Sequence, residues 1–596
     1  MHRIPLAPQC TPQSASKQLS LCTSQKPLKR DHTDAETPLP ELQGSISVDP
    51  RPCSDPPLPA NSKVCIVGAG ISGLYIALLL QSLNIPNLSI DILEADNRVG
   101  GRVYTHRFSD QPHDYYDVGA MRFPRLPFMD RVFDLFRRMG VSLEPYYMDG
   151  LNCRQLRNGQ LLIGRADSGV SDPYGVGRCS GGSVPDEVVP QVDTLLQQAF
   201  EPFQRALHND MVQGFNQLME VDELTAREYL RRGGKDGRGP QYDFTTIQWM
   251  ETNSTSTGQF DQALSECVLD SFEFHSLQDN VEWAQVSGGT SRVVERMCQA
   301  LHDQVGDRIQ LRKRVVRIAI NRCHDGEDNL SVQCAGENHL RSGYTTVFNT
   351  SPLGCLQRME TTSLHLHPMQ REAIRCLRSE NSTKVALKFS YPWWIVDCGI
   401  AGGGCSSSDL PSRTCVYPSH VGVESGSRPA VLLASYTWGQ DANRMGALVR
   451  PSSDVQEEEL VEIILRDLAT LHQPHVSFEK LREAYIGHHA FCWGNSPFAS
   501  GAFALFGPGQ FSNLYPFLCR PAADGKFHIV GEASSIHHGW VVGALNSAYM
   551  AVYRFLSRFK QWRAIEKLER DWGTVYEMRI GNDIPVRIRQ PKPDCR

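Results

Sequence analysis

A run of glycines at fixed spacing follows the first strand-like segment of the chain. That segment, residues 63–67, is short, apolar and β-branched, and it leads directly into Gly68-Ala69-Gly70-Ile71-Ser72-Gly73. In such a run the first glycine makes a tight turn, the second lets the backbone approach a pyrophosphate, and the third lets a helix pack closely on the strand. The helix expected over residues 74–83 directs its positive N-terminus at the phosphates. These residues therefore predict a dinucleotide site at Gly68, Gly70, Ile71, Ser72 and Gly73.

An acidic residue lies at the distance that this interpretation requires. Residues 87–93 are predicted to form a second strand, and Glu94 follows it, 21 residues beyond Gly73. A carboxylate about 20 residues after the last glycine binds a ribose hydroxyl in dinucleotide-binding folds. A glycine-rich turn in an unrelated α/β protein is the alternative. The strand, glycines, helix, second strand and acid together favour the dinucleotide.

The residues after Glu94 resemble those of one flavoprotein family. Arg98-Val99-Gly100-Gly101-Arg102 places two more glycines and two arginines where they can wrap a second side of the pyrophosphate. With Glu94 and Ala95 this run resembles the Glu-Ala-x-x-Arg-x-Gly-Gly-Arg signature of the flavin-containing amine oxidases. The resemblance implies tightly bound FAD rather than a shuttling nicotinamide, with Glu94 and Arg102 among its ligands.

A second segment is similar to one branch of that family, the L-amino-acid oxidases, and the likeness covers most of residues 61–560. Gly119-Ala120-Met121-Arg122-Phe123-Pro124 resembles a segment whose backbone passes the flavin, here at Ala120 and Met121. Its arginine binds the substrate carboxylate, for which a planar guanidinium is suited. Residues 435–442 resemble the stretch that supplies a tyrosine hydroxyl, so Tyr436 would partner Arg122. A surface arginine in a turn and a core tyrosine are the alternatives.

The same resemblance assigns two further positions. Lys384 lies in the apolar run 383–387, ten residues before Trp394, where the family places a lysine that holds a water against the reactive ring nitrogen of the flavin. A lysine in an apolar strand needs a partner or a purpose. Lys388 is the competing candidate. Val315 resembles a residue whose backbone holds the adenine ring, although an ordinary buried strand explains it equally well.

The most specific motif lies near the C-terminus. Gly531 and Glu532, followed by residues 535–544, resemble the closing signature of the family. The resemblance implies that the acid contacts the ribityl–pyrophosphate region. It also implies that a helix N-terminus, here at Val541, approaches the flavin.

Substrate contacts are expected in the same signature. Gly539 would present its carbonyl oxygen to the substrate amine, and Trp540 would wall the site. Phe498 and Trp540 fall where simple amine oxidases place paired tyrosines, which favours an α-amino acid over a plain amine. His537 and His538 could serve as bases, but we expect them to be structural.

Taken together, the resemblance is nearest to the fungal-type L-amino-acid oxidases. It implies FAD-dependent oxidative deamination of an L-amino acid by dioxygen, giving a 2-oxo acid, ammonia and hydrogen peroxide. An amine oxidase or a decarboxylating amino-acid 2-monooxygenase of the same fold is one alternative. A non-catalytic FAD-binding scaffold is another, and the intact set of Lys384, Arg122 and Tyr436 weighs against it.

Composition and charge exclude several other classes. The 596 residues are 41% hydrophobic and 21% charged, which argues against a largely disordered protein, and the net charge of −6 argues against a nucleic-acid binder. No apolar run is long enough for a membrane helix, and no signal peptide begins the chain. We therefore expect a cytoplasmic protein, with secretion by another route left open, and a possible homodimer. The eighteen cysteines are scattered, so no metal site is expected.

The chain is too long for one core and predicts an α/β fold of several domains. We expect a Rossmann-type FAD-binding domain, a substrate domain with a mixed sheet, and a helical insert. The predicted ranges are 1–60 for a proline-rich disordered leader or pro-segment, 61–126, 281–345 and 511–560 for the FAD-binding domain, 127–280 for the mainly helical domain, 346–510 for the substrate-binding domain, and 561–596 for a C-terminal tail with a docked helix.

Overall fold

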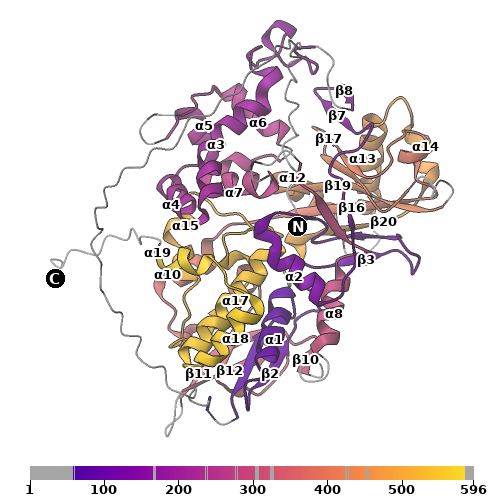
Figure 1. Ribbon diagram of the computed structural model, residues 1–596. Helices are drawn as coiled ribbons and strands as arrows, with labels where there is room; N and C mark the ends of the chain where they lie inside the picture. The colour runs from indigo at the N-terminus through magenta and orange to yellow at the C-terminus, as the bar shows by residue number, and fades with distance from the viewer. Residues whose placement is uncertain are drawn as a thin grey trace, which may run out of the picture.

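The computed structural model arranges the chain in three parts (Figure 1). A parallel sheet with its helices lies at the bottom of the view, a group of helices at the upper left, and a larger sheet at the upper right. The described residues are 58–583 without 60, 165–169, 235–236, 238, 255, 276, 278–279, 302–307, 323–327, 423–425, 427 and 451–454. The predicted leader, residues 1–60, lies outside the described residues except for Leu58 and Pro59, and so does the end of the predicted tail.

The sheet that contains the segment before the glycine run is parallel, as the motif predicts. Its strands lie in the order β10 (Ile309–Gln310), β2 (Ser89–Leu93), β1 (Lys63–Val67), β14 (Thr346–Asn349) and β22 (Phe527–Ile529), and all neighbours run parallel. The strands are mostly buried, as is usual for parallel sheets with helices on their faces. Helices α1 (Ile71–Leu83) and α17 (Val541–Arg558) pack beside each other here. Helix α1 begins three residues earlier than predicted, and the Rossmann-type expectation is confirmed.

The second part is built on a mixed sheet of seven strands. Their order is β20 (Tyr485–Cys492), β16 (Ser382–Phe389), β19 (Ala430–Trp438), β18 (Thr414–Tyr417), β17 (Gly404–Ser408), β7 (Arg154–Arg157) and β8 (Gln160–Ile163). Only β17 and β7 pair in parallel. Short apolar runs at residues 385–390 and 430–436 predict strands, and these are β16 and β19. The apolar face and the early acidic residues of 454–472 predict an amphipathic helix. It is α13 (Val455–Leu471), which packs on this sheet.

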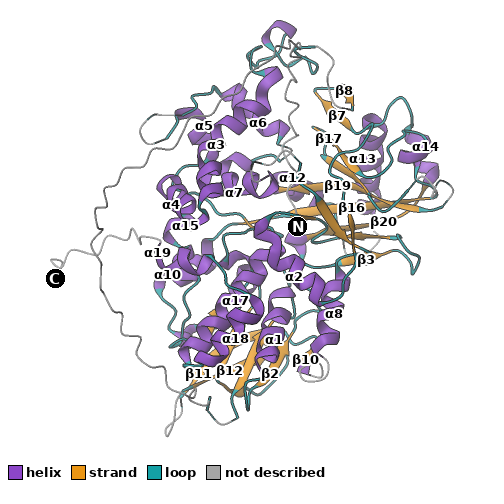
Figure 2. Ribbon diagram, viewed as in Figure 1, coloured by secondary structure: helices purple, strands orange, loops and turns teal. Residues whose placement is uncertain are grey.

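The third part is helical, as expected, but the predicted range 127–280 also contains strands. Its helices are α2 (Asp130–Arg138), α3 (Val192–Asn209), α4 (Met211–Val221), α5 (Ala226–Arg232), α6 (Phe244–Asn253) and α7 (Leu264–His275). Figure 2 shows α3–α7 gathered apart from the strands of the large sheet. Strands β7 and β8 form a hairpin because Asn158 and Gly159 both adopt positive φ, the geometry of a tight two-residue turn. This hairpin extends the mixed sheet instead of belonging to the helical group.

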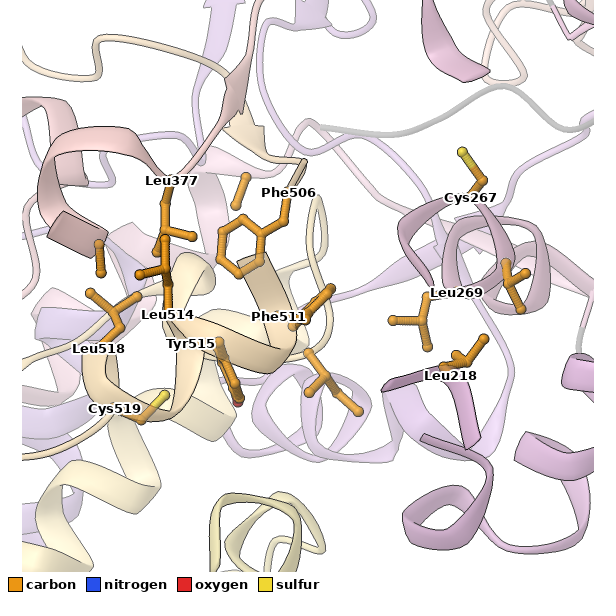
Figure 3. Close-up of a cluster of buried hydrophobic side chains, with 14 of the residues drawn as sticks. Leu218, Cys267, Leu269, Leu377, Phe506, Phe511, Leu514, Tyr515, Leu518 and Cys519 are labelled. Atoms are coloured by element: carbon orange, nitrogen blue, oxygen red, sulfur yellow. The ribbon is translucent and has the colours of Figure 1, made fainter. Parts of the chain in front are cut away.

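A continuous apolar cluster joins the helical group to the parallel-sheet part. Figure 3 shows side chains of α4 and α7 on one side and of residues 506–519 on the other. The rings of Phe215, on α4, and Phe511, on α15 (Gln510–Asn513), meet edge to face with centroids 5.5 Å apart. Large buried aromatic contacts of this kind hold neighbouring elements in one orientation. Residues 506–519 are therefore anchored to the helices opposite them.

The C-terminal segment docks on the parallel-sheet part. It contains α18 (Trp562–Trp572) and α19 (Glu577–Asp583), so the predicted tail begins with a docked helix. The guanidinium of Arg131, on α2, donates to the carbonyl oxygens of Trp572 and Thr574 at 3.0 and 3.1 Å. Within the described ranges, no helix is long and apolar enough to cross a membrane.

Candidate active site

One cavity runs along the carboxyl ends of the parallel strands, the edge at which α/β folds bind ligands. It encloses about 1300 Å³ of empty space, including the part open to solvent. Most of the residues predicted to bind cofactor line it, namely Gly68, Gly70, Ile71, Ser72, Glu94, Arg102, Ala120, Val315, Gly531, Glu532, Trp540 and Val541, together with Gly539. Gly73, Met121, Arg122, Lys384 and Tyr436 are not among the described residues that line it.

The glycine run has the shape of a cradle for a pyrophosphate. A Cβ atom on Gly73 would lie 2.0 Å from the carbonyl oxygen of Gly68, so only glycine lets α1 pack on this turn. A Cβ atom on Gly70 would instead have no neighbour closer than the Cα of Gly101, at 3.9 Å, because this face opens into the cavity. No acidic side chain occupies the first turn of α1, which leaves its positive end to an anion. The residues therefore fit a dinucleotide.

Glu94 ends β2 and is held rigidly beside this turn. Its carboxylate accepts hydrogen bonds from the backbone N–H groups of Ala69 and Asp96, at 2.6 and 2.8 Å. Burial raises the pKa of Glu94, although these two bonds favour the ionised form. A fixed acceptor at this place can select a ribose hydroxyl.

Arg102 and Glu532 tie three chain segments together at the far side of the cavity. The guanidinium of Arg102 contacts the Glu532 carboxylate at 3.1 Å and donates to the carbonyl oxygen of Ala502 at 2.9 Å. Glu532 in turn accepts the N–H groups of Ala504 and Gly539, both at 2.8 Å. The turn that carries Gly539 is thus fixed relative to the cradle.

Arg122 is a buried cation enclosed by aromatic rings. Its side chain is 1% exposed, and its guanidinium carbon lies 5.6–5.8 Å from the ring centroids of Phe274, Trp283 and Tyr146. One terminal nitrogen approaches the sulfur of Met148 at 3.1 Å. Attraction between a guanidinium and a carboxylate is strong in such low-dielectric surroundings. The enclosure is suited to a planar anionic group.

The register of the large sheet places Lys384 directly opposite Tyr436. The Lys384 nitrogen lies 4.9 Å from the centroid of the Tyr436 ring and donates to the carbonyl oxygens of Asp117 and Gly119, at 3.0 and 2.8 Å. Burial, and secondarily the charge of Arg122, lower the pKa of Lys384 to about 7. At neutral pH this amine can therefore hold or release a proton beside the 117–122 segment.

The competing lysine is placed differently. Lys388 forms an ion pair with Asp114, with 2.7 Å between its nitrogen and the carboxylate oxygen. That pair gives the charge of Lys388 a structural partner away from Arg122. Of the two lysines, Lys384 therefore fits the active-site role better.

Both histidines of the closing signature face carboxylates. The Nδ1 atom of His537 lies 2.5 Å from Glu273, and that of His538 lies 2.5 Å from Glu266, both on α7. Neither histidine is among the described residues that line the cavity. Their contacts are consistent with the structural role expected for them.

The two positions compared with the paired tyrosines of amine oxidases both line the cavity. They are Phe498, which is 37% exposed, and the buried Trp540. The comparison of Phe498 with a cage tyrosine stays a prediction. Phe503 is a further aromatic residue near the site, buried in one apolar cluster with Tyr436, Trp438 and Met121. The run 502–506 is apolar throughout, and this signal could have identified Phe503 as buried.

Comparisons with known proteins show which family and fold the chain resembles. The profile of the flavin containing amine oxidoreductases matches residues 71–556. L-amino-acid oxidase 4 of Hebeloma cylindrosporum is 36% identical over 531 residues, which cover 84% of this chain and 82% of that protein. The L-amino-acid oxidase of Siganus canaliculatus is 32% identical over 500 residues, covering 83% and 85%. The solved cyclohexylamine oxidase of Brevibacterium oxydans IH-35A has a similar fold, with a TM-score of 0.60 at 18% identity, covering 86% of this chain and 100% of that one.

Proposed function

This chain belongs to the family of flavin containing amine oxidoreductases, and from that membership we propose that it is an FAD-dependent L-amino-acid oxidase. The reaction is oxidative deamination, which converts the amino acid and dioxygen to a 2-oxo acid, ammonia and hydrogen peroxide. The observation that carries the choice of substrate is the buried guanidinium of Arg122. A planar guanidinium binds a carboxylate in a bidentate geometry, and a plain amine has no carboxylate for it to bind.

The cofactor contacts follow from the cavity. We assign the pyrophosphate to the backbone around Gly70, Ile71 and Ser72, the ribose to Glu94, and the ribityl side to Arg102 and Glu532. Ala120, Met121, Val315, Gly531, Trp540 and Val541 complete the proposed cofactor site, with Gly68 and Gly73 shaping its turn. FAD, when bound, supplies the two-electron acceptor and the reaction with dioxygen that gives hydrogen peroxide.

The substrate is oriented by groups of the chain itself. Arg122 binds its carboxylate bidentately, and the Tyr436 hydroxyl donates a further hydrogen bond. The carbonyl oxygen of Gly539 accepts from the amine, and Trp540 closes the chamber. Lys384, whose pKa is lowered to about 7, would hold a water beside the flavin. Fixing both ends of the amino acid directs its α-hydrogen towards the cofactor.

Three readouts test this proposal on the full-length protein purified with FAD. We expect a yellow protein that forms peroxide, ammonia and a 2-oxo acid with at least one of the twenty L-amino acids, and less with its D-enantiomer. Peroxide from amines alone would indicate an amine oxidase, and an amide product would indicate a 2-monooxygenase. A folded protein that takes up no FAD would refute the proposal. The homodimer and the cytoplasmic location remain predictions.

A further inference from the structure

The described part of the C-terminal segment contacts the turn that carries Gly539 and Trp540 through Tyr576 and Glu577. After α18 the chain follows the surface of α2, held by Arg131, and then turns inward. Glu577, the first residue of α19, is 1% exposed although its side chain is a carboxyl group. Burial of a carboxylate is unfavourable unless several donors compensate for the lost water. The buried Glu577 carboxyl group therefore needs hydrogen-bond donors from the residues around it.

All three donors to Glu577 belong to the turn or to the helix that follows it. Its Oε1 atom accepts from the Ser535 hydroxyl at 3.0 Å and from the Asn546 amide at 2.7 Å. Its Oε2 atom accepts from the backbone N–H of Ile536 at 3.0 Å. Glu532 holds the other end of the turn through the N–H of Gly539. Two buried carboxylates thus fix both ends of the turn at residues 535–540.

The middle of the turn is held by the neighbouring tyrosine. The hydroxyl of Tyr576 contacts Nε2 of His537, and Nδ1 of the same ring contacts Glu273 on α7. The His537 ring stacks on Phe128 with centroids 5.2 Å apart, and Phe128 meets Trp540 edge to face at 5.7 Å. Displacement of His537 would therefore move a ring that packs against Trp540.

We propose that Tyr576 and Glu577 are positioning residues for the substrate chamber, acting through the turn at residues 535–540. This inference rests on the proposed function, since Gly539 and Trp540 face the substrate only under that function. Loss of either contact leaves the turn fixed by Glu532 but free to shift at its start. A misplacement of about 1 Å costs on the order of 10²-fold in rate. The C-terminal segment is then part of the active-site architecture rather than a tail.

The test measures the rate constant for reduction of bound FAD in anaerobic single-turnover mixing. The substrate is the L-amino acid that gives wild type its highest peroxide rate. Glu577→Ala should lower this rate constant at least about tenfold per bound flavin. Glu577→Gln should recover part of the loss, because its amide oxygen can still accept from Ile536. Glu566→Ala, an exposed position on α18, is the matched control and should keep the wild-type rate.

Tyr576→Phe removes only the hydroxyl and keeps the buried ring, so it tests the inference even if Glu577→Ala fails to fold. We expect a lower kcat with a much smaller change in KM. Wild-type rate constants per bound flavin in Tyr576→Phe and Glu577→Gln, with only FAD content or thermal stability reduced, would overturn the proposal. If wild type is reduced by amines and by no amino acid, the proposed function fails instead. The variants are then compared with the best amine, which the turn would position in the same way.

Discussion

Replacing Arg122 by methionine separates an amino-acid oxidase from an amine oxidase. Methionine is unbranched and apolar, so it can fill the space between Phe274, Trp283, Tyr146 and Met148 without leaving an empty cavity. The variant should therefore fold and retain FAD. It lacks the charge that would bind a substrate carboxylate.

The expected magnitude follows from the burial of the guanidinium. Removing one partner of a buried, hydrogen-bonded charge pair costs about 2–5 kcal/mol, which corresponds to roughly 30- to 4,000-fold in kcat/KM at about 1.4 kcal/mol per decade. Arg122→Lys keeps the charge but loses the bidentate fork, so its activity should lie between wild type and Arg122→Met.

The assay compares peroxide formation from the best L-amino acid and from the amine that its decarboxylation would give. Arg122→Met should lose turnover of the amino acid and leave turnover of the amine, however slow, nearly unchanged. An equal loss with both substrates, or a wild type that already prefers the amine, would show that Arg122 does not bind a carboxylate. The reasoning from its burial would then be wrong.

Three further perturbations test other parts of the site. Gly70→Val should yield a folded protein without FAD, because its side chain would enter the cavity. Gly73→Val should not fold, since its Cβ atom would lie 2.0 Å from the carbonyl oxygen of Gly68. FAD binding by Gly70→Val would contradict the assignment of the pyrophosphate to this turn. Tyr436→Phe should lower kcat/KM for the amino acid roughly 2- to 13-fold, the equivalent of about 0.5–1.5 kcal/mol in activation free energy, and should leave turnover of the amine unchanged. Lys384→Met should retain FAD and slow its reoxidation by dioxygen, and unchanged half-reactions in stopped flow would assign the role elsewhere. Folding lowers the pKa of Lys384 from 10.5 to about 7, so between these pH values the unfolded chain binds one proton more than the folded chain. The free energy of unfolding therefore rises with pH in this range, by up to about 1.4 kcal/mol per pH unit. Denaturant unfolding of Lys384→Met should lack this rise.

Local motifs were sufficient to predict the dinucleotide edge of the fold. Gly68, Gly70 and Gly73 act within one turn, and Glu94 ends the next strand, so their positions depend on a short βαβ unit. The role of each of these residues depends on the backbone geometry of a unit of about thirty residues. Such geometry can be inferred from spacing alone.

Contacts between distant segments could not be predicted in the same way. Lys384 and Tyr436 were each identified singly, but only the pairing of β16 with β19 brings them opposite each other. The β7–β8 hairpin carries its own Asn-Gly turn signal, yet nothing near it indicates pairing with β17. Glu577 lies in the segment expected to be a tail with a docked helix, and nothing local indicates its burial, because its donors lie some forty residues away in the sequence. Partners of this kind are selected by packing, which single-sequence periodicity does not encode.

The strand order of the parallel sheet has a consequence for biosynthesis. Its central strands β1 and β2 emerge first from the ribosome, whereas β22 and the N-terminus of α17 follow more than 430 residues after β2. At a translation rate of about 5–20 residues per second, this delay is roughly 20–90 s. During that interval the cradle around Gly70 lacks Glu532 and one edge strand of its sheet. Cofactor capture is therefore a late, near-complete-chain event, and chains truncated before α17 should emerge as apoprotein even when FAD is abundant.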